Sequence, residues 1–375
     1  MNLLHWFYEA QVFLKTKCIE FRPYGMTQLS SLDFHVLGYC ISHSNCGWSL
    51  DISWVHFDST SVKMILNSCT AVGSRTASAS GHILSLNARF SCSDRDFCSM
   101  LELPHTVLQG LETIKLGVNK CITSTSLDKL AAILEAKDLP NLQTLDFSNI
   151  SVGNGGAVSL FRALRTSSST IRNLCLSESE IGHNDAEELR EFLMISHTLS
   201  YLDIHRNPFP SESLQLISIG LAISTSLTSL NLSFIKFDQP AIEHLSAALG
   251  VNHTLRELHL THCGIDSDGA YNLAEILEEN RTLRILFVQG NELGEAGAKA
   301  FAEMLEKNQS LKKLSLVDSS VRISGVCTLI TALEHNDTLE KLFLHEKCKP
   351  PELAKNIRHI FVESFCRFHN PLSLL

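Results

Sequence analysis

Several features are missing from this 375-residue sequence, and each absence excludes a class of protein. No run of about 18 apolar residues occurs, which is the length that a membrane-spanning helix needs, so no membrane span is predicted. The N-terminal stretch carries Glu9 and Gln11 where a secretory signal peptide needs an apolar core. None of the 12 cysteines belongs to a C-x-x-C pair. We therefore expect a cytoplasmic protein with reduced thiols.

Basic surfaces and nucleotide-binding loops are missing as well. The net charge is −9, whereas a nucleic-acid surface needs a basic stripe, so no nucleic-acid partner is predicted. No G-x-x-x-x-G-K-[ST] segment is present, which excludes a P-loop nucleotide site. Cys40, His43 and Cys46 are zinc-ligand types at close spacing, but a closed zinc site needs a further ligand, and core packing is the preferred interpretation. No metal or other cofactor is therefore expected.

The sequence does contain an internal repeat. The stretch that begins at Leu255 opens with an L-x-x-L-x-L pattern and continues into an amphipathic helix, and the next copy begins 28 residues later at Leu283. The opening residues of the successive copies are Leu111, Leu142, Ile171, Leu199, Leu227, Leu255, Leu283, Leu311 and Leu339. The steps between them are 31, 29 and then 28 residues throughout. Such self-similarity predicts a repeat architecture.

Each copy supplies a strand and a helix that cannot bury their leucines alone, so stacked copies must build one core between a parallel sheet and a row of helices. The pattern predicts an α/β leucine-rich-repeat solenoid, a right-handed horseshoe with parallel strands on the concave face, helices on the convex face and a helical N-terminal cap. Its long period resembles the ribonuclease-inhibitor class of these repeats. The predicted segments are a helical N-terminal segment at 1–45, irregular repeats at 46–110, regular repeats at 111–348 and a C-terminal capping helix at 349–375.

The two ends of the chain are predicted to cap the solenoid with helices. Residues 1–20 and 31–40 have helical patterns, and residues 48–52 alternate like a first repeat strand. At the other end, residues 352–365 have a helical pattern that places Ile357 and Phe361 on one face.

Two polar positions recur in the repeats. The residue three beyond the last strand leucine is Asn119, Asn207, Cys263 or Asn291, as in the ribonuclease-inhibitor class, and we expect it to bond the neighbouring backbone. Looser turns are predicted where other residues stand, namely Ile150, Ser179, Ile235, Ser319 and Lys347. Asparagines in N-x-S/T sequons occupy the end of the helix at Asn252, Asn280, Asn308 and Asn336. We interpret them as left-handed helix ends rather than as glycosylation sites.

The N-terminal residues resemble a known family. Residues 3–11, LLHWFYEAQ, look like the end of the helical domain that precedes the repeats in NOD-like receptors. Residues 32–41, LDFHVLGYCI, and residues 46–52, CGWSLDI, resemble the entry to the repeat domain of the same family. The resemblance implies a sensing repeat domain in innate immunity that recognises a protein or a pathogen-derived ligand. The nucleotide-binding NACHT domain of that family has no counterpart here, so its ATP binding is not carried over.

Two other functions remain open on sequence grounds. One is an enzyme inhibitor similar to ribonuclease inhibitor, which would use the same face of the repeats. The other is a regulator similar to the Ran GTPase-activating protein. Neither of these functions needs the residues at 3–11.

The concave face is the predicted partner-binding surface. Side chains at alternate strand positions point away from the core, and equivalent positions on neighbouring strands lie about 4.8 Å apart, so they form rows. The binding residues predicted on these rows are Tyr201, Asp203, His205, Glu257, His259, Ile285, Phe287, Val317 and Phe343. We expect an apolar centre at Phe287 and Phe343, with small Ser315 between them leaving room for a partner's side chain.

Catalysis is not predicted for this surface. An open sheet offers no water-excluding pocket in which a nucleophile, a base and an orienting acid could meet. The alternative to partner binding is that the C-terminal helix covers Phe287 and Phe343 through Ile357 and Phe361.

Overall fold

The computed structural model describes residues 12–14, 18–21, 31–43, 47–53, 60–61, 63–65, 82–103, 105–136, 138–166, 170–345 and 360–363. The chain forms two compact units, Met1–Pro208 and Phe209–Leu375, which we call the first and the second unit. The boundary between them falls inside the segment of regular repeats.

In the first unit, strands and helices alternate along the chain. The strands are β1 (Val12–Leu14), β2 (Cys18–Phe21), β3 (Gly47–Asp51), β4 (His82–Asn87), β5 (Thr113–Lys115), β6 (Thr144–Asp146), β7 (Asn173–Cys175) and β8 (Tyr201–Asp203). The helices are α2 (Ser31–His43), α4 (Asp94–Met100), α5 (His105–Leu108), α6 (Ser124–Glu135), α7 (Val158–Thr166) and α8 (His183–Ile195). β1 and β2 pair antiparallel, and from β2 to β8 each strand pairs parallel with the next.

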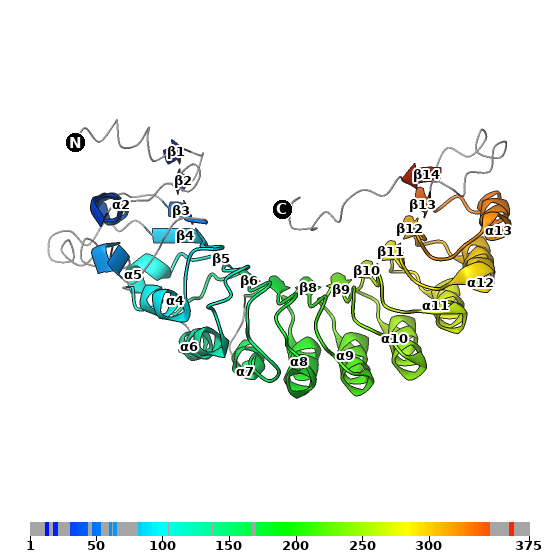
Figure 1. Ribbon diagram of the computed structural model, residues 1–375, viewed down its shortest axis with the longest axis horizontal. Coiled ribbons are helices and arrows are strands. Elements are labelled where there is room, and N and C mark those ends of the chain that lie inside the picture. The colour runs from blue at the N-terminus through cyan, green and yellow to red at the C-terminus, as the bar shows by residue number, and fades with distance from the viewer. Residues whose placement is uncertain are drawn as a thin grey trace. The chain divides into compact units, whose positions relative to one another are not determined.

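The second unit continues the alternation with more regular repeats. Its strands are β9 (Ser229–Asn231), β10 (Glu257–His259), β11 (Ile285–Phe287), β12 (Lys313–Ser315), β13 (Lys341–His345) and β14 (Ile360–Glu363). Its helices are α9 (Ser211–Ile223), α10 (Gln239–Val251), α11 (Ser267–Glu279), α12 (Gly294–Lys307) and α13 (Ile323–Leu333). The strands from β9 to β14 pair parallel in chain order. In each unit the helices lie on one side of the strands (Figure 1).

The leucines of the repeat pattern form the core, as the sequence predicts. Leu258 and Leu286 stand opposite each other on β10 and β11, and both are fully buried. The apolar side of α11, with Leu273 and Leu277, is buried as well. Since strand neighbours alternate, the residues on either side of these strand leucines point to the opposite face of the sheet, which we call the strand face. The predicted α/β leucine-rich-repeat solenoid is therefore confirmed.

Asparagine side chains join consecutive repeats where the strands turn away. Asn291 donates from Nδ2 to the carbonyls of Leu260 and Val288, at 2.8 and 2.6 Å. Its Oδ1 accepts the N–H groups of Cys263 and Ile265 in the preceding repeat. One buried amide thus satisfies four backbone groups that water cannot reach.

The looser turns predicted at two serines are not found. Ser179 donates from Oγ to the carbonyl of Phe147, 2.8 Å away, and Ser319 donates to the carbonyl of Val288, 3.2 Å away. Each hydroxyl therefore reaches a carbonyl of the preceding repeat, as the asparagine amide does. Ile150 and Ile235 fill the same position with buried apolar side chains. Lys347 lies outside the described residues.

A second set of asparagines joins the helix ends, in a conformation other than the predicted one. Asn280 caps α11 with φ −67° and ψ 128°, which is extended rather than left-handed. Its Nδ2 donates to the carbonyl of Leu249 at the end of the preceding helix, and its Oδ1 accepts the N–H of Leu283 at 2.8 Å. Asn252, Asn308 and Asn336 make equivalent bonds. The asparagine is required for its side chain and not for a positive φ.

The predicted terminal helices are wrong where the structure describes them. Residues 12–14 and 18–21, expected in an N-terminal helix, form the antiparallel strands β1 and β2. Residues 360–363, expected in a C-terminal capping helix, form β14, which extends the sheet beside β13. Ile357 lies outside the described residues, as do residues 1–11. The other predicted N-terminal helix is confirmed as α2.

Candidate partner-binding surface

Three aromatic rings follow one another along the strand face of the second unit. The ring of His259 on β10 lies 4.8 Å from that of Phe287 on β11, in an edge-to-face arrangement. The ring of Phe287 lies 6.4 Å from that of Phe343 on β13, also edge to face. All three residues are half-buried. We call His259, Phe287 and Phe343 the aromatic ridge.

The expected gap above Ser315 is closed. Ser315 stands between the two phenylalanines on β12 but is only 2% exposed, so it offers no slot for a partner's side chain. Strands two apart are separated by about 10 Å, whereas the two ring centroids are 6.4 Å apart, so the rings lean toward each other over the serine. The hydroxyl of Ser315 donates to Gln289 Oε1 at 2.6 Å. The apolar centre is therefore a continuous ridge, without a slot between Phe287 and Phe343.

On the side of the ridge where the strands begin, one margin row is charged. It runs through Glu257, Ile285, Lys313 and Lys341 on consecutive strands. Glu257 accepts a hydrogen bond from His259 Nε2 at 2.8 Å, which orients the ring at the end of the ridge. That bond is the main cause of the lowered pKa of Glu257, and the charge of Lys313 contributes. Ile285, half-buried, adds apolar surface next to Phe287.

The opposite margin, at the carboxyl ends of the strands, is less charged. It carries Gln289 and Val317, both half-buried, and His345. His345 Nε2 lies 3.3 Å from a carboxylate oxygen of Asp318. Of the predicted binding residues in this unit, Glu257, His259, Ile285, Phe287, Val317 and Phe343 all lie on the strand face within these rows.

The predicted residues of the first unit form a polar cluster instead. Asp203 on β8 was expected to be available, but its side chain is 0% exposed. The hydroxyl of Tyr201 approaches Asp203 Oδ2 at 3.2 Å, and His205 Nδ1 approaches Oδ1 at 2.7 Å. His205 Nε2 lies 3.6 Å from Glu178, which Arg206 pairs at 3.0 Å. Asp203 therefore holds its two neighbours in place and is not itself a contact surface.

No metal site is found among the described residues of these faces. Within them, no group of three or more His, Cys, Asp or Glu side chains is arranged to hold a metal ion. The thiol of Cys175, next to Asp203 on the strand face, has a pKa raised by burial and then by the charges of Asp203 and Asp146, which disfavours a nucleophilic thiolate. None of the described helices combines the length and the apolar character that crossing a lipid bilayer requires.

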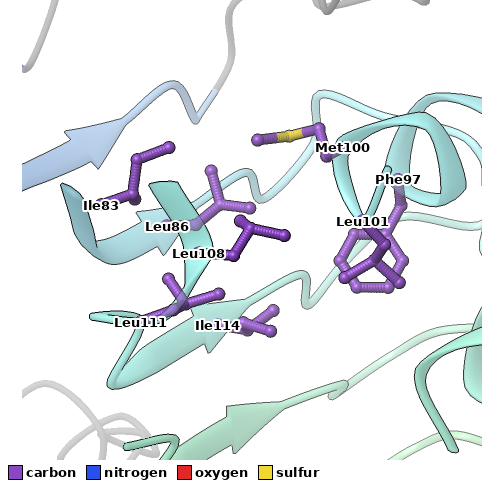
Figure 2. A pocket seen from close by; sticks show the side chains of 8 residues that line it. All are labelled: Ile83, Leu86, Phe97, Met100, Leu101, Leu108, Leu111 and Ile114. Atoms are coloured by element: carbon purple, nitrogen blue, oxygen red, sulfur yellow. The ribbon is translucent and has the colours of Figure 1, made fainter. Parts of the chain in front are cut away.

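An apolar cavity of about 10 Å³ lies in the first unit, away from the predicted residues. Eight apolar side chains line it, among them Ile83 of β4, Met100 of α4 and Ile114 of β5 (Figure 2). A water molecule needs a site of at least this size together with polar partners, so the cavity stays dry. We interpret it as imperfect packing between an irregular and a regular repeat.

Sequence reasoning missed two features of the surface. Lys313 and Lys341 lie in one of the predicted rows but were not among the predicted binding residues. They occupy the same position of adjacent repeats, 28 residues apart, and that spacing could have indicated a pair of neighbouring charges. The contact between Phe287 and Phe343 was also missed. A serine between two aromatic residues in one row leaves space that the rings themselves can fill.

Comparison with known proteins supports a leucine-rich-repeat domain. The TMOD/LMOD leucine-rich domain matches residues 221–354, which lie in the second unit and make up less than half of the chain. No curated protein matches. A solved structure of leiomodin-1 actin-binding site 2 is 16% identical, with 47% of this chain and 86% of that chain covered and a TM-score of 0.34. A yeast Rad7–Elc1 complex is 13% identical, with 89% and 88% covered and a TM-score of 0.49. The chain is thus similar in sequence to a known leucine-rich domain along residues 221–354.

Proposed function

We propose that the chain is a non-catalytic protein-recognition module whose aromatic ridge contacts a partner. The observation that carries this proposal is the edge-to-face row of His259, Phe287 and Phe343 on the strand face. The equivalent positions on β9 and β12 are Asn231 and Ser315, which shows that the fold does not require aromatic residues there.

The anatomy of the surface supports binding to a protein. Aromatic residues are enriched among the side chains that contribute most to protein–protein affinity, and apolar centres with polar rims are typical of such interfaces. Here Ile285 and Val317 widen the apolar centre, while Glu257, Lys313 and His345 supply polar groups around it.

A sensing role in a cytoplasmic NOD-like receptor is the specific form of this proposal. It rests on the resemblance at residues 3–11 and 32–41. Residues 32–41 lie in α2, where Phe34, Leu37 and Ile41 are buried. Residues 3–11 lie outside the described residues. An upstream reading frame with a P-loop domain would support this form, and its absence from the gene would contradict it.

The experiment is a selection of peptides from a displayed random library on the purified chain, followed by affinity measurements on variants. Phe287→Ser copies the residue that β12 carries in the same row. We expect it to weaken the selected peptides about tenfold or more, because truncation of a central aromatic contact has that scale of effect. Tyr271→Ser is the matched control, since Tyr271 is an exposed aromatic residue on α11, on the helix side of the same unit.

The proposal fails if selected peptides bind Phe287→Ser as tightly as the unchanged chain, or if Tyr271→Ser weakens them equally. Melting curves of both variants should stay close to that of the unchanged chain. A large drop for Phe287→Ser would show that the ridge is structural.

A further inference from the structure

We propose that the aromatic ridge binds an acidic peptide segment, with apolar side chains on Phe287 and Phe343 and a carboxylate on Lys313. This inference rests on the proposed function and names the chemistry of the partner.

Lys313 is a cation that the described chain leaves unneutralised beside the ridge. Its neighbour Lys312 pairs with Glu340 at 3.3 Å, whereas Lys313 has no carboxylate within ion-pair distance in the described part of the chain. Lys313 alternates with Leu314 and so shares the strand face with Ser315, over which the two phenylalanine rings meet. An ammonium group thus stands two residues from the middle of the apolar centre.

A second lysine stands directly opposite on the next strand. Lys313 and Lys341 are paired residues of β12 and β13. Like charges directly opposite each other repel, and a carboxylate bound beside Lys313 would reduce that repulsion. The chain as a whole carries a net charge of −9, so two lysines on paired positions run against its general character.

The carboxylate of Glu257, on the same margin row as Lys313, is already engaged. Glu257 lies two strands from Lys313, about 10 Å away, and is hydrogen-bonded to His259. The positive charge of Lys313 nonetheless helps to lower the pKa of Glu257, so it acts on a carboxylate two strands away, beyond Ile285. A partner's carboxylate placed above Ile285 or beside Lys313 would meet the same field at shorter range.

The geometry suits an extended peptide better than a nucleic acid. Alternate side chains of an extended segment lie about 7 Å apart, close to the spacing of Lys313 and Ser315 along β12. In a bound peptide, an apolar residue could therefore contact the aromatic ridge while an acidic residue two positions away contacts the ammonium group of Lys313. Phosphates along a nucleic-acid strand would also meet Glu257 and the Asp318 beside His345, which would repel them.

The test uses fluorescence anisotropy with three labelled synthetic peptides on the full chain. In them leucine alternates with glutamate, with glutamine or with lysine. We expect the glutamate peptide to bind about tenfold more tightly than the lysine peptide, and added salt to reduce that difference. Lys313→Glu should weaken the glutamate peptide several-fold, and Lys313→Gln should weaken it less.

Lys299→Glu is the matched control. It makes the same change of net charge on α12, on the helix side of the same unit, where Lys299 pairs with Glu303. Equal weakening by Lys299→Glu and Lys313→Glu would overturn the inference, because it would show a response to net charge alone. Melting curves of both variants check that they fold.

Other outcomes separate this inference from the proposed function. If the glutamate and lysine peptides bind equally, and both are lost in Phe287→Ser, the acidic partner is wrong while the ridge remains a binding surface. If peptides bind but Phe287→Ser has no effect, the proposed function fails. If no peptide binds, or a labelled single-stranded oligonucleotide displaces the glutamate peptide, the inference is overturned.

Discussion

Asn280 donates a hydrogen bond from its side-chain amide to the backbone carbonyl of Leu249, 2.8 Å away, and so ties the end of α11 to the end of α10. The same side chain accepts the backbone N–H of Leu283 at 2.8 Å. Both partners are buried, so water cannot replace the amide when it is removed.

Replacing Asn280 with alanine should therefore destabilise the chain by about 2–4 kcal/mol, because two buried backbone groups lose their partners. Chemical denaturation followed by far-UV circular dichroism would measure the loss. Asn336 makes the equivalent bonds with less burial, so Asn336→Ala should cost less. Equal costs at the two positions would contradict an explanation based on burial.

Core truncation should have local effects. Leu258→Ala is expected to cost about 2–5 kcal/mol through lost burial and a residual cavity. Because repeats contact their neighbours in sequence, hydrogen exchange should increase first in the strands and helices next to β10. Exchange that rises uniformly along the chain would argue against this nearest-neighbour behaviour. Tyr271→Ala, at an exposed position on the helix of the same repeat, serves as the comparison.

The carboxylate of Glu257 should make stability depend on pH. The hydrogen bond from His259 holds the pKa of Glu257 below its ordinary value of 4.5 in the folded chain. Its ionised form therefore stabilises the folded state above that value, and the contribution is lost as the pH falls through the lowered pKa. Glu257→Gln should melt below the unchanged chain near neutral pH, and the difference should shrink as the pH falls below 4.5. Glu279→Gln removes a carboxylate that is 88% exposed and serves as the comparison.

Thiol reactivity should follow burial. Burial raises the pKa of Cys92 and of Cys263 to about 12, so only about one molecule in ten thousand carries the thiolate at pH 8. Cys121 is exposed. Brief alkylation with iodoacetamide followed by peptide mass spectrometry should label Cys121 and spare the other two until the chain is unfolded. Rapid labelling of Cys263 in the folded chain would contradict its placement inside the repeat.

The sequence predicted the repeat elements because their signals are local and repeated. Strand leucines such as Leu258 and helix leucines such as Leu273 recur at the same positions of successive repeats. Both are buried, as the repeat pattern predicts. The chain ends lack that redundancy. Ile360 and Phe361 fit the apolar face of a helix predicted at 352–365. Residues 360–363 nevertheless form a strand, because the unpaired edge of β13 offers hydrogen bonds that a helical pattern does not reveal.

The candidate surface was predicted less completely than the fold. Row membership follows from alternation, so Phe287 and Phe343 were placed correctly. Exposure does not follow from alternation, since it depends on the sizes of neighbouring side chains. Asp203 and Ser315 point to the strand face and are nevertheless buried. Asp203 is covered by Tyr201 and His205, which are hydrogen-bonded to it, and Ser315 lies between the rings of two phenylalanines.

The asparagine ladder at the helix ends also restricts which length changes the chain can accept. Each described 28-residue step from Ile171 onward has a side-chain acceptor three residues before the next opening leucine, as with Ser196, which accepts the N–H of Leu199. One residue inserted or deleted at a helix end would displace this side chain, which would then lose its hydrogen bonds to the next opening leucine and to the preceding helix. In the 31-residue step that begins at Leu111, the position is Leu139, which has no such acceptor. Insertions and deletions should therefore be tolerated between α6 and β6 and rejected at the helix ends of the second unit.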